Sequence, residues 1–170
     1  MIPLSSTISS GLTWAKLPSN RGYELKRNGE MVGSLRRPSS WCSRFVAETQ
    51  NGQWTFRRGG WLGAGAQILN STSQPPIASF KSIWGCGGTL TFADGQTFRL
   101  ECKGLWRPVW SVIGEAGQPV VRLHTREKAV ELPTGVNLPE DRLLLLIMFV
   151  WYQVLQARED AASVAVIAAS

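Results

Sequence analysis

The chain has 170 residues, of which 44% are hydrophobic and 18% are charged, so it suits one ordinary globular domain and excludes a wholly disordered chain. The formal net charge is +6, and the excess is local. Residues 21–58 carry eight Lys and Arg against three Glu, whereas residues 59–170 carry nine charges of each sign. A basic leading third can attract the phosphate groups of lipids or nucleic acids, but charge alone indicates neither a fold nor a reaction.

The cysteines and the first residues bear on the cellular compartment. Cys42, Cys86 and Cys102 stand far apart, with no paired spacing. This odd and sparse set predicts reduced core thiols in a reducing compartment rather than a disulfide framework. Residues 1–12 are rich in Ser and Thr and have no periodicity, so we expect a flexible segment. Residues 1–16 lack the basic and apolar regions of a signal peptide, so we expect a cytoplasmic protein. Peripheral attachment to a membrane is compatible with that location.

From residue 13 to residue 131, short alternating runs are separated by turn signals. The dipeptides Asn28-Gly29, Asn51-Gly52 and Asp94-Gly95 are typical of two-residue hairpin turns whose central residues have positive φ. In the run that follows the third turn, Phe98 and Leu100 alternate with polar residues. Alternation with a period of two predicts antiparallel strands that have one face on the core and one face in water.

The pattern changes after Pro133. Leu138-Pro139-Glu140-Asp141 predicts the start of a helix, because proline suits the first turn and acids favour the positive end of the helix dipole. Residues 143–155 are apolar at twelve of thirteen positions, so every face of the helix needs cover. The uncharged stretch 143–157 is shorter than the ~20 residues that a bilayer requires. We therefore predict a buried helix over residues 139–158, ended in water by Glu159-Asp160, rather than a membrane span.

The combination of a strand meander with one wholly apolar helix near the C-terminus is unusual. The features that make up this combination are the order of elements from residue 22 to residue 156, the segment 84–95, a predicted strand Trp106-Arg107-Pro108-Val109-Trp110, and the segment 138–142. On these features the chain resembles the tubby C-terminal-like superfamily, which includes tubby proteins, LURP-one-related proteins and phospholipid scramblases. A closed barrel has no open edges and offers an apolar helix an enclosed lining, which agrees with that resemblance.

The resemblance implies a mostly β (α+β) fold: a closed antiparallel β-barrel of about 10–12 strands wrapped around a hydrophobic C-terminal helix. The expected organisation is a flexible segment 1–12, a single domain over residues 13–160 with its central helix at 139–158, and a tail at 161–170. The sequence leaves open whether this tail extends the helix, adds a strand or frays.

The resemblance also bears on ligands. Tubby domains bind phosphoinositide headgroups through surface Lys and Arg, and scramblases are tied to membranes, so an anionic phospholipid is the implied partner. The acidic calcium-binding segment of scramblases is not found near this helix, because Glu140-Asp141 supplies too few oxygen ligands for calcium. A lipid-moving activity is therefore disfavoured.

Three pairs of basic residues at predicted strand ends form the candidate anionic-ligand site. These residues are Lys26, Arg27, Arg36, Arg37, Arg57 and Arg58. Arginine offers bidentate contacts to phosphate, and a neighbouring Trp41, Trp54 or Trp61 would suit a membrane interface. The competing interpretation is an ordinary solvated surface, since charged strand ends also keep β-proteins soluble. The eight tryptophans are otherwise expected to fill the barrel.

Other candidates favour structural roles. His124, the only histidine, lies in a predicted strand without a nucleophile motif, so we expect a strand-surface residue and no catalytic site. The glycine runs around Gly63-Ala64-Gly65 and Gly85-Cys86-Gly87-Gly88 lack a following helix and a Lys-Ser/Thr pair, which favours strand bends over phosphate loops. Cysteine and histidine spacing offers no metal site, and no cofactor is expected.

The sequence thus predicts a non-enzymatic binding or adaptor module that recognises anionic phospholipid headgroups through a basic face at residues 26–58. A nucleic-acid-binding or protein-interaction barrel is the alternative, and a membrane-inserted scramblase-like protein is a third. The oligomeric state is not indicated by the sequence.

Overall fold

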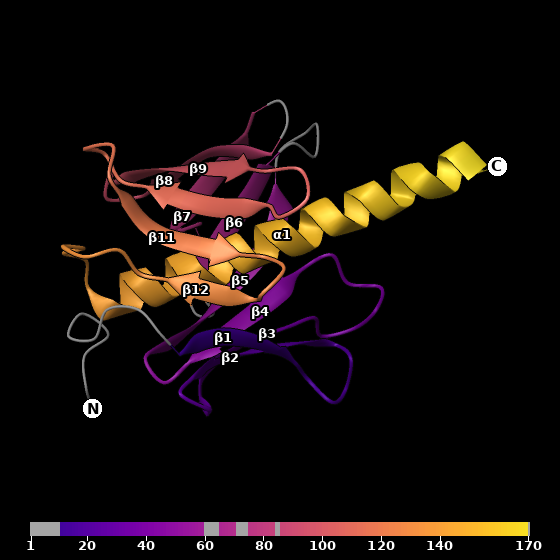
Figure 1. Ribbon diagram of the computed structural model, residues 1–170, viewed down its shortest axis with the longest axis horizontal. Helices are drawn as coiled ribbons and strands as arrows, with labels where there is room; N and C mark the ends of the chain where they lie inside the picture. Colours follow the sequence, from indigo (N-terminus) through magenta and orange to yellow (C-terminus); the bar gives the residue numbers. More distant parts are fainter. Residues whose placement is uncertain (1–10, 60–64, 71–74, 84–85, 170) are drawn as a thin grey trace.

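Twelve strands form a closed barrel around one long helix in the described part of the computed structural model (Figure 1). The structure describes residues 11–59, 65–70, 75–83 and 86–169. The predicted mostly β fold, a closed antiparallel barrel with a hydrophobic C-terminal helix, is confirmed. Of the predicted flexible segment 1–12, residues 1–10 lie outside the described residues, and the first strand begins at Leu12.

The strands are short and follow one another at regular intervals. Their bounds are β1 Leu12–Lys16, β2 Gly22–Arg27, β3 Glu30–Arg36, β4 Phe45–Thr49, β5 Gly52–Gly59, β6 Gly65–Asn70, β7 Ala78–Ser82, β8 Gly87–Phe92, β9 Thr97–Lys103, β10 Val109–Ile113, β11 Pro119–His124 and β12 Ala129–Glu131. The helix α1 spans Glu140–Ala169.

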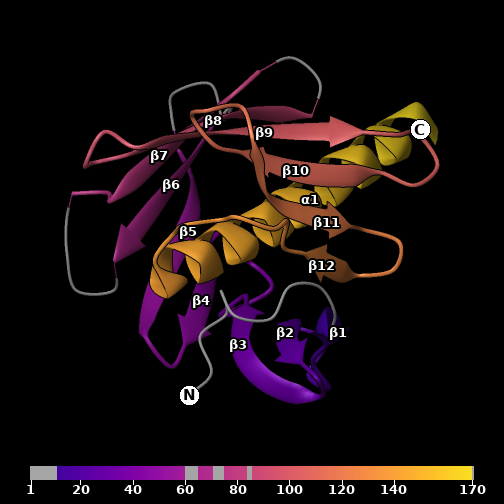
Figure 2. The ribbon, with the colours of Figure 1, turned by 60° about the vertical axis from the view of Figure 1, so that its left-hand side comes forward.

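Each strand pairs antiparallel with the next one in the chain, and β12 returns to pair with β1 (Figure 2). This closing contact has a single residue pair, Thr13 with Ala129, whereas β1 and β2 share five pairs. Closure removes the unpaired edges that an open sheet would expose. Because successive strands run in opposite directions, their connecting loops alternate between the two rims of the barrel.

Strand side chains alternate between the barrel interior and the outer surface. On β9, Phe98 and Leu100 are buried while Arg99 between them is exposed, as the period-two pattern predicts. The neighbouring strand β8 shows the same alternation, and its Leu90 pairs with Phe98 of β9. Polar residues therefore face water around the barrel, and the apolar half of each strand lines its interior.

The turn predictions are confirmed in part. Asn28 and Gly29 both have positive φ, 51° and 89°, as a type I′ turn between β2 and β3 requires. Asp94-Gly95 does connect β8 to β9, but only Gly95 has positive φ. The hairpin predicted at Asn51-Gly52 is confirmed, since β4 and β5 pair antiparallel there, but its turn differs from the expected type because neither residue has positive φ. The Asn51 amide instead donates a hydrogen bond to Thr49 Oγ1, and Thr49 pairs with Gly52.

Helix α1 runs through the barrel and supplies its core (Figures 1 and 2). Phe149, Trp151 and Tyr152 are fully buried. The ring of Trp151 stacks on Trp14 of β1 at 5.3 Å, and Phe149 packs edge-on against Phe56 of β5 at 5.6 Å. Burial raises the pKa of Tyr152 to about 12. The all-round apolar pattern of residues 143–155 therefore has its predicted cause, since barrel strands cover every face of the helix.

The predicted end of the helix at residue 158 is wrong. The helix continues to Ala169, and burial ends at Gln156, so residues 157–169 project from the barrel (Figure 1). Two features account for the extension. Glu159 and Asp160 are ion-paired with barrel arginines instead of ending the helix in water, and the alanines that follow have the highest helix propensity.

Candidate functional site

One rim of the barrel, here called the exit rim, surrounds the point where α1 leaves it. The exit rim consists of the described loops 17–21, 37–44, 104–108 and 125–128, residues 83 and 86, the strand ends beside them, and the projecting helix segment 157–169. The opposite rim holds the hairpin turns after β2, β4, β8 and β10 and the start of α1. Both rims are made of short loops, so they differ chiefly in the side chains they carry.

Basic residues are concentrated on the exit rim. All 18 Lys and Arg and all 12 Asp and Glu lie in the described ranges, so the comparison between the rims covers every charged side chain. Thirteen of the basic residues belong to the exit rim: Lys16, Arg21, Arg36, Arg37, Arg44, Arg57, Arg58, Lys81, Lys103, Arg107, Arg126, Lys128 and Arg158. The acids of its loops and helix segment are three, Glu127, Glu159 and Asp160, and Glu24, Glu101 and Glu131 lie two residues inside neighbouring strands, as Arg57 does. Such an excess of one sign produces a positive potential over this end of the molecule.

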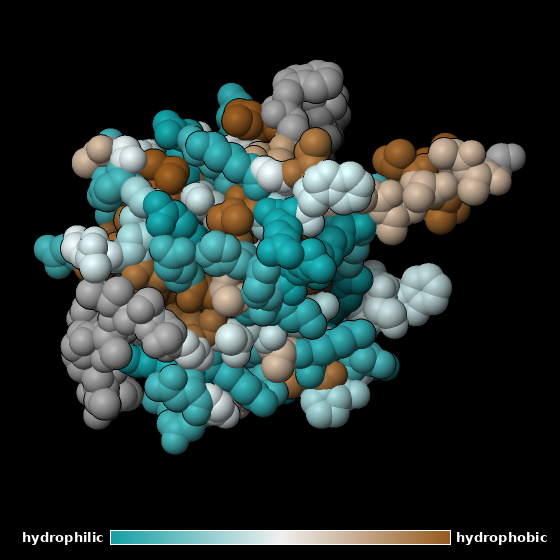
Figure 3. Space-filling view, viewed as in Figure 1, coloured by the Kyte–Doolittle hydropathy of each residue, from teal (hydrophilic) through white to brown (hydrophobic). Residues whose placement is uncertain are grey.

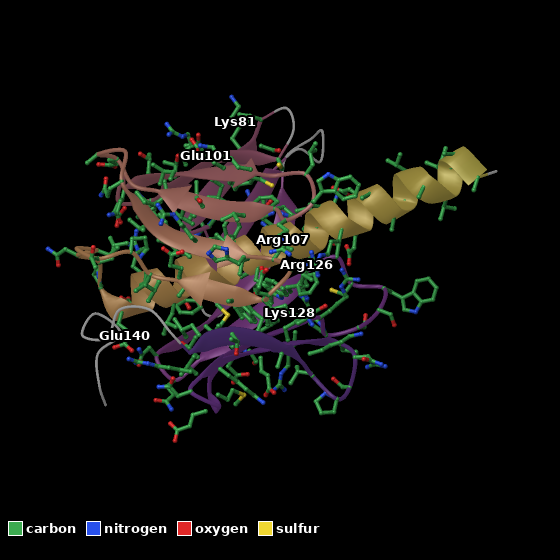
Figure 4. All side chains as sticks on the ribbon, in the orientation of Figure 1. Lys81, Glu101, Arg107, Arg126, Lys128 and Glu140 are labelled. Atoms are coloured by element: carbon green, nitrogen blue, oxygen red, sulfur yellow. The ribbon has the colours of Figure 1, made fainter. Side chains whose placement is uncertain are left out.

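The opposite rim has the reverse balance. Its basic residues are Lys26, Arg27 and Arg142, and its acids are Glu30, Asp94, Glu115, Glu140 and Asp141. Figure 4 shows the separation: Arg107, Arg126 and Lys128 lie towards the helix exit, and Glu140 lies at the other end. The positive charge of the chain is therefore directed to one end of the barrel axis.

The six predicted ligand-binding residues do not form one site. The register of the β2–β3 hairpin pairs Lys26 with Met31 near the turn and Gly22 with Arg36 at the far end. Five residues of strand separate Met31 from Arg36, about 17 Å, so the pair 26–27 lies at the opposite end of the barrel from Arg36. Arg36, Arg37, Arg57 and Arg58 share the exit rim because β3 and β5 run in the same direction. The expectation of one basic face over residues 26–58 is wrong in this respect.

Two of these four arginines hold the helix. Arg37 forms an ion pair with Glu159, and its guanidinium lies 4.6 Å from the centre of the Phe45 ring. Arg58 is hydrogen-bonded to Gln156, and its Nη2 lies 2.6 Å from Asp160 Oδ1. Arg58 continues the inward parity of Phe56 on β5, and Arg37, the first residue after β3, continues that of Leu35, which points both side chains into the barrel mouth. They brace α1 where it leaves the core.

The other two arginines face the outer surface. Arg57 Nε donates a hydrogen bond to Gln67 Oε1 on β6, at 3.0 Å. Arg36 is exposed at the end of β3. The outward basic surface of the exit rim therefore depends more on residues that the sequence analysis did not single out, among them Arg107, Arg126 and Lys128.

Exposed apolar side chains also gather on the exit rim. Trp41, Leu105 and Trp106 are 97%, 96% and 93% exposed on loops 37–44 and 104–108. Ile83 and the helix residues Val164, Val166 and Ile167 add to them. Among the described residues, Met31 is the one large exposed hydrophobic side chain on the opposite rim. Apolar and basic groups thus share one end of the molecule.

These tryptophans correct the expectation that all eight fill the barrel. Trp14, Trp54, Trp110 and Trp151 are buried, while Trp61 and Trp84 lie outside the described residues. The predicted strand over residues 106–110 is also shorter than expected, because β10 begins at Val109. Gly104 and Pro108 enclose Leu105 and Trp106, and these two turn-forming residues were the sequence signal for a loop.

A pocket of about 360 Å³ opens on the exit rim between loops 17–21 and 37–44 and the helix. Four basic side chains and one acid line it: Lys16, Arg21, Arg37, Arg158 and Glu159. Ser39 and Ser40 add hydroxyl groups, and Phe45 and Leu155 contribute an apolar wall. This lining has the composition of a site for a phosphorylated group attached to an apolar body.

His124 lies in a small polar cluster on the barrel surface. Its Nε2 is 3.1 Å from Glu131 Oε2, and Arg122 Nη1 is 2.9 Å from Glu131 Oε1. The hydrogen bond with His124, together with that from Arg122, holds the pKa of Glu131 below its usual range. These are surface contacts between β11 and β12, as the strand-surface interpretation of His124 predicts. Within the described residues, no group of three or more His, Cys, Asp or Glu could hold a metal ion.

Comparison with known proteins adds no relative. No protein-family model, no curated protein and no solved structure matches this chain. A search of the described residues for helices long and apolar enough to cross a membrane finds none. The residues 143–157, considered above as a span, line the centre of the barrel over most of their length.

Proposed function

We propose that this protein binds anionic membrane surfaces through the exit rim, as a non-enzymatic binding module. The observation that carries the proposal is the coincidence of thirteen basic residues with exposed Trp41, Leu105 and Trp106 at one end of the barrel. A membrane surface interacts favourably with both the basic and the apolar side chains. Basic side chains are attracted by anionic headgroups, and tryptophan suits the boundary between headgroups and acyl chains.

The projecting part of α1 favours a membrane over a nucleic acid. Val164, Val166 and Ile167 are 66–74% exposed on a segment that none of the described strands covers. Figure 3 shows this segment as an apolar rod beside the hydrophilic surface of the barrel. A nucleic acid would use the basic side chains and could stack on the tryptophans, but it offers no apolar phase for these aliphatic groups.

The pocket beside the helix supports recognition of single phosphorylated headgroups, of which a phosphoinositide is the candidate. Arg21, Arg37 and Lys16 would provide charge-assisted hydrogen bonds to phosphate oxygens, and Ser39 and Ser40 neutral ones. An incoming phosphate would compete with Glu159 for Arg37, which couples headgroup binding to the base of the projecting helix. Kinship with the tubby C-terminal-like superfamily, supported by the closed barrel around a central helix, is part of the same proposal.

Vesicle flotation tests the proposal with two matched variants. The first carries Arg107→Glu, Arg126→Glu and Lys128→Glu on the exit rim. The second carries Lys26→Glu, Arg27→Glu and Arg99→Glu, none of which belongs to that rim. Each triple change lowers the formal net charge from +6 to zero, so a difference between the variants reports position and not total charge.

We expect flotation with phosphatidylserine or phosphoinositide vesicles and none with neutral phosphatidylcholine. Each basic residue near an anionic surface contributes about 1 kcal/mol, so the exit-rim variant should bind roughly 100-fold more weakly than wild type. The control variant should retain most of the binding. An equal loss of vesicle binding in both variants, or no flotation of the wild-type protein at physiological salt, would overturn the proposal. Salt-sensitive binding to single-stranded RNA or DNA by a protein that does not float would then favour the nucleic-acid alternative.

A further inference from the structure

Two cysteines that are far apart in the sequence meet at the exit rim. β8 and β9 are antiparallel, and Gly87 pairs with Glu101. Extending this register by one residue places Cys86 opposite Cys102. The contacts agree, since Cys86 Sγ lies 3.8 Å from the backbone carbonyl oxygen of Cys102. The expectation of three separate core thiols is therefore wrong: Cys86 is exposed, and Cys102 and Cys42 are only partly buried.

The geometry of this pair suits a covalent link. Residues directly opposite each other on antiparallel strands have Cα atoms about 4.5–5.5 Å apart. A disulfide requires Cα atoms roughly 4.4–6.8 Å apart, a range that includes this spacing. Cys86 directly precedes β8, and Gly87, with its φ of 140°, connects it to the strand. The two side chains also lie close together, because a side-chain hydrogen bond between the thiols contributes to the raised pKa of Cys102. Cys42 lies on the loop between β3 and β4, away from this pair in the barrel order.

We propose that Cys86 and Cys102 form a reversible disulfide by exchange with a small-molecule disulfide such as oxidised glutathione. The thiolate of Cys86 attacks one sulfur of oxidised glutathione, whose S–S bond breaks and releases one glutathione thiol. Cys102 then loses its proton to solvent, and its sulfur attacks Cys86 Sγ, which releases the second glutathione thiol. Two protein thiols are oxidised and one glutathione disulfide is reduced to two thiols.

The surroundings of the two thiols determine which of them reacts first with oxidised glutathione. Cys86 is exposed and can meet a dissolved disulfide, whereas Cys102 is partly buried against the core. Burial, together with smaller contributions from the hydrogen bond and the charge of Cys86, raises the pKa of Cys102 to about 12. The contribution from the charge of Cys86 disappears once Cys86 is in the mixed disulfide. Cys102 is therefore suited to the second step and not to the first.

The link would act on the exit rim itself. Cys102 is one residue from the end of β9, and loop 104–108 with Leu105 and Trp106 follows directly. A disulfide would join this strand end to the start of β8 and so restrict the base of the loop. The inference concerns the thiol pair alone and stands independently of the proposed membrane binding.

Peptide mapping of the wild-type protein tests the inference. After incubation with oxidised glutathione and alkylation of free thiols, trypsin separates Cys86 in residues 82–99 from Cys102 in residues 100–103. We expect these two peptides to be joined in the monomer fraction, with Cys42 either alkylated or carrying glutathione. The Cys42→Ser variant should give the same joined peptides, and Cys102→Ser should leave a stable glutathione adduct on Cys86.

Three outcomes would overturn the inference. The first is a wild-type protein in which Cys86 keeps its glutathione adduct while Cys102 stays free. The second is joined peptides that occur only in covalent dimers. The third is that Cys86 and Cys102 are both alkylated, and were therefore free thiols, under conditions in which Cys42 carries glutathione. Because the decisive readings come from the wild-type chain, they do not depend on whether any variant folds.

Discussion

The two halves of helix α1 are both mostly apolar, at twelve of fourteen positions in residues 143–156 and nine of thirteen in residues 157–169, but their surroundings are opposite. In the inner half, residues 143–156, barrel strands cover every face of the helix. Thirteen of these fourteen residues are buried, and the remaining one, Gln153, is half-buried. In the outer half, residues 157–169, every residue is exposed. Apolar composition alone therefore does not determine the role of a helix segment. Inside the barrel it stabilises the fold, and beyond the exit rim it is available to a partner.

The largest effect is expected from the inner half. Phe149→Ala removes a fully buried ring that packs against Phe56 and Phe80, so the free energy of unfolding should fall by roughly 3–5 kcal/mol. Urea denaturation measures this change. A loss below about 1 kcal/mol, which is typical of surface substitutions, would contradict the placement of the helix in the core.

An intermediate effect is expected where the two halves meet. Arg37→Ala removes the ion pair with Glu159 and the contact with Phe45, and should lower the free energy of unfolding by roughly 1 kcal/mol. Arg57→Ala is the matched control, since Arg57 is exposed and donates a hydrogen bond to Gln67 on the outer surface, and it should cost less than about 0.5 kcal/mol. High salt should narrow the difference, because the pair is partly exposed. Equal costs for both variants would show that the helix is not braced by Arg37.

The smallest effect on stability is expected from the outer half. A variant that ends at Asp160 lacks the exposed Val164, Val166 and Ile167, and its free energy of unfolding should stay within about 0.5 kcal/mol of wild type. Its binding to anionic vesicles should weaken roughly tenfold or more, since side chains of this size contribute about 1.5–3 kcal/mol each when fully buried. A large loss of stability with unchanged vesicle binding would reverse the roles assigned to the two halves.

Local patterns in the sequence were sufficient to predict the strands and the buried helix, whereas the closed barrel around that helix was implied by the resemblance to the tubby C-terminal-like superfamily. Alternation such as that of Phe98, Arg99 and Leu100 indicated strands with one wet face. The unbroken apolar run of residues 143–155 required cover on all sides, which a closed barrel provides. Both signals are periodic and lie within one element, so they can be interpreted without knowing the partners.

The features that were missed depend on partners distant in sequence. Glu159 and Asp160 resembled a helix end because their arginines, Arg37 and Arg58, lie about a hundred residues earlier in the chain. The pairing of Cys86 with Cys102 likewise depends on the register of two strands. Lys26 was grouped with Arg36 because the two are near in sequence, although one strand length separates them. The exposed Trp41 and Trp106 departed from the usual burial of tryptophan.

Hydrogen–deuterium exchange of the protein with and without phosphoinositide vesicles tests the role of the exit rim most directly, because both rims are observed in one sample. We predict slower exchange in loops 37–44 and 104–108 and in the outer helix 157–169 when vesicles are present, with the opposite-rim turns 93–96 and 114–118 unchanged. Protection at the opposite rim, or binding without protection at the exit rim, would contradict the assignment of this end of the barrel as the membrane-binding surface.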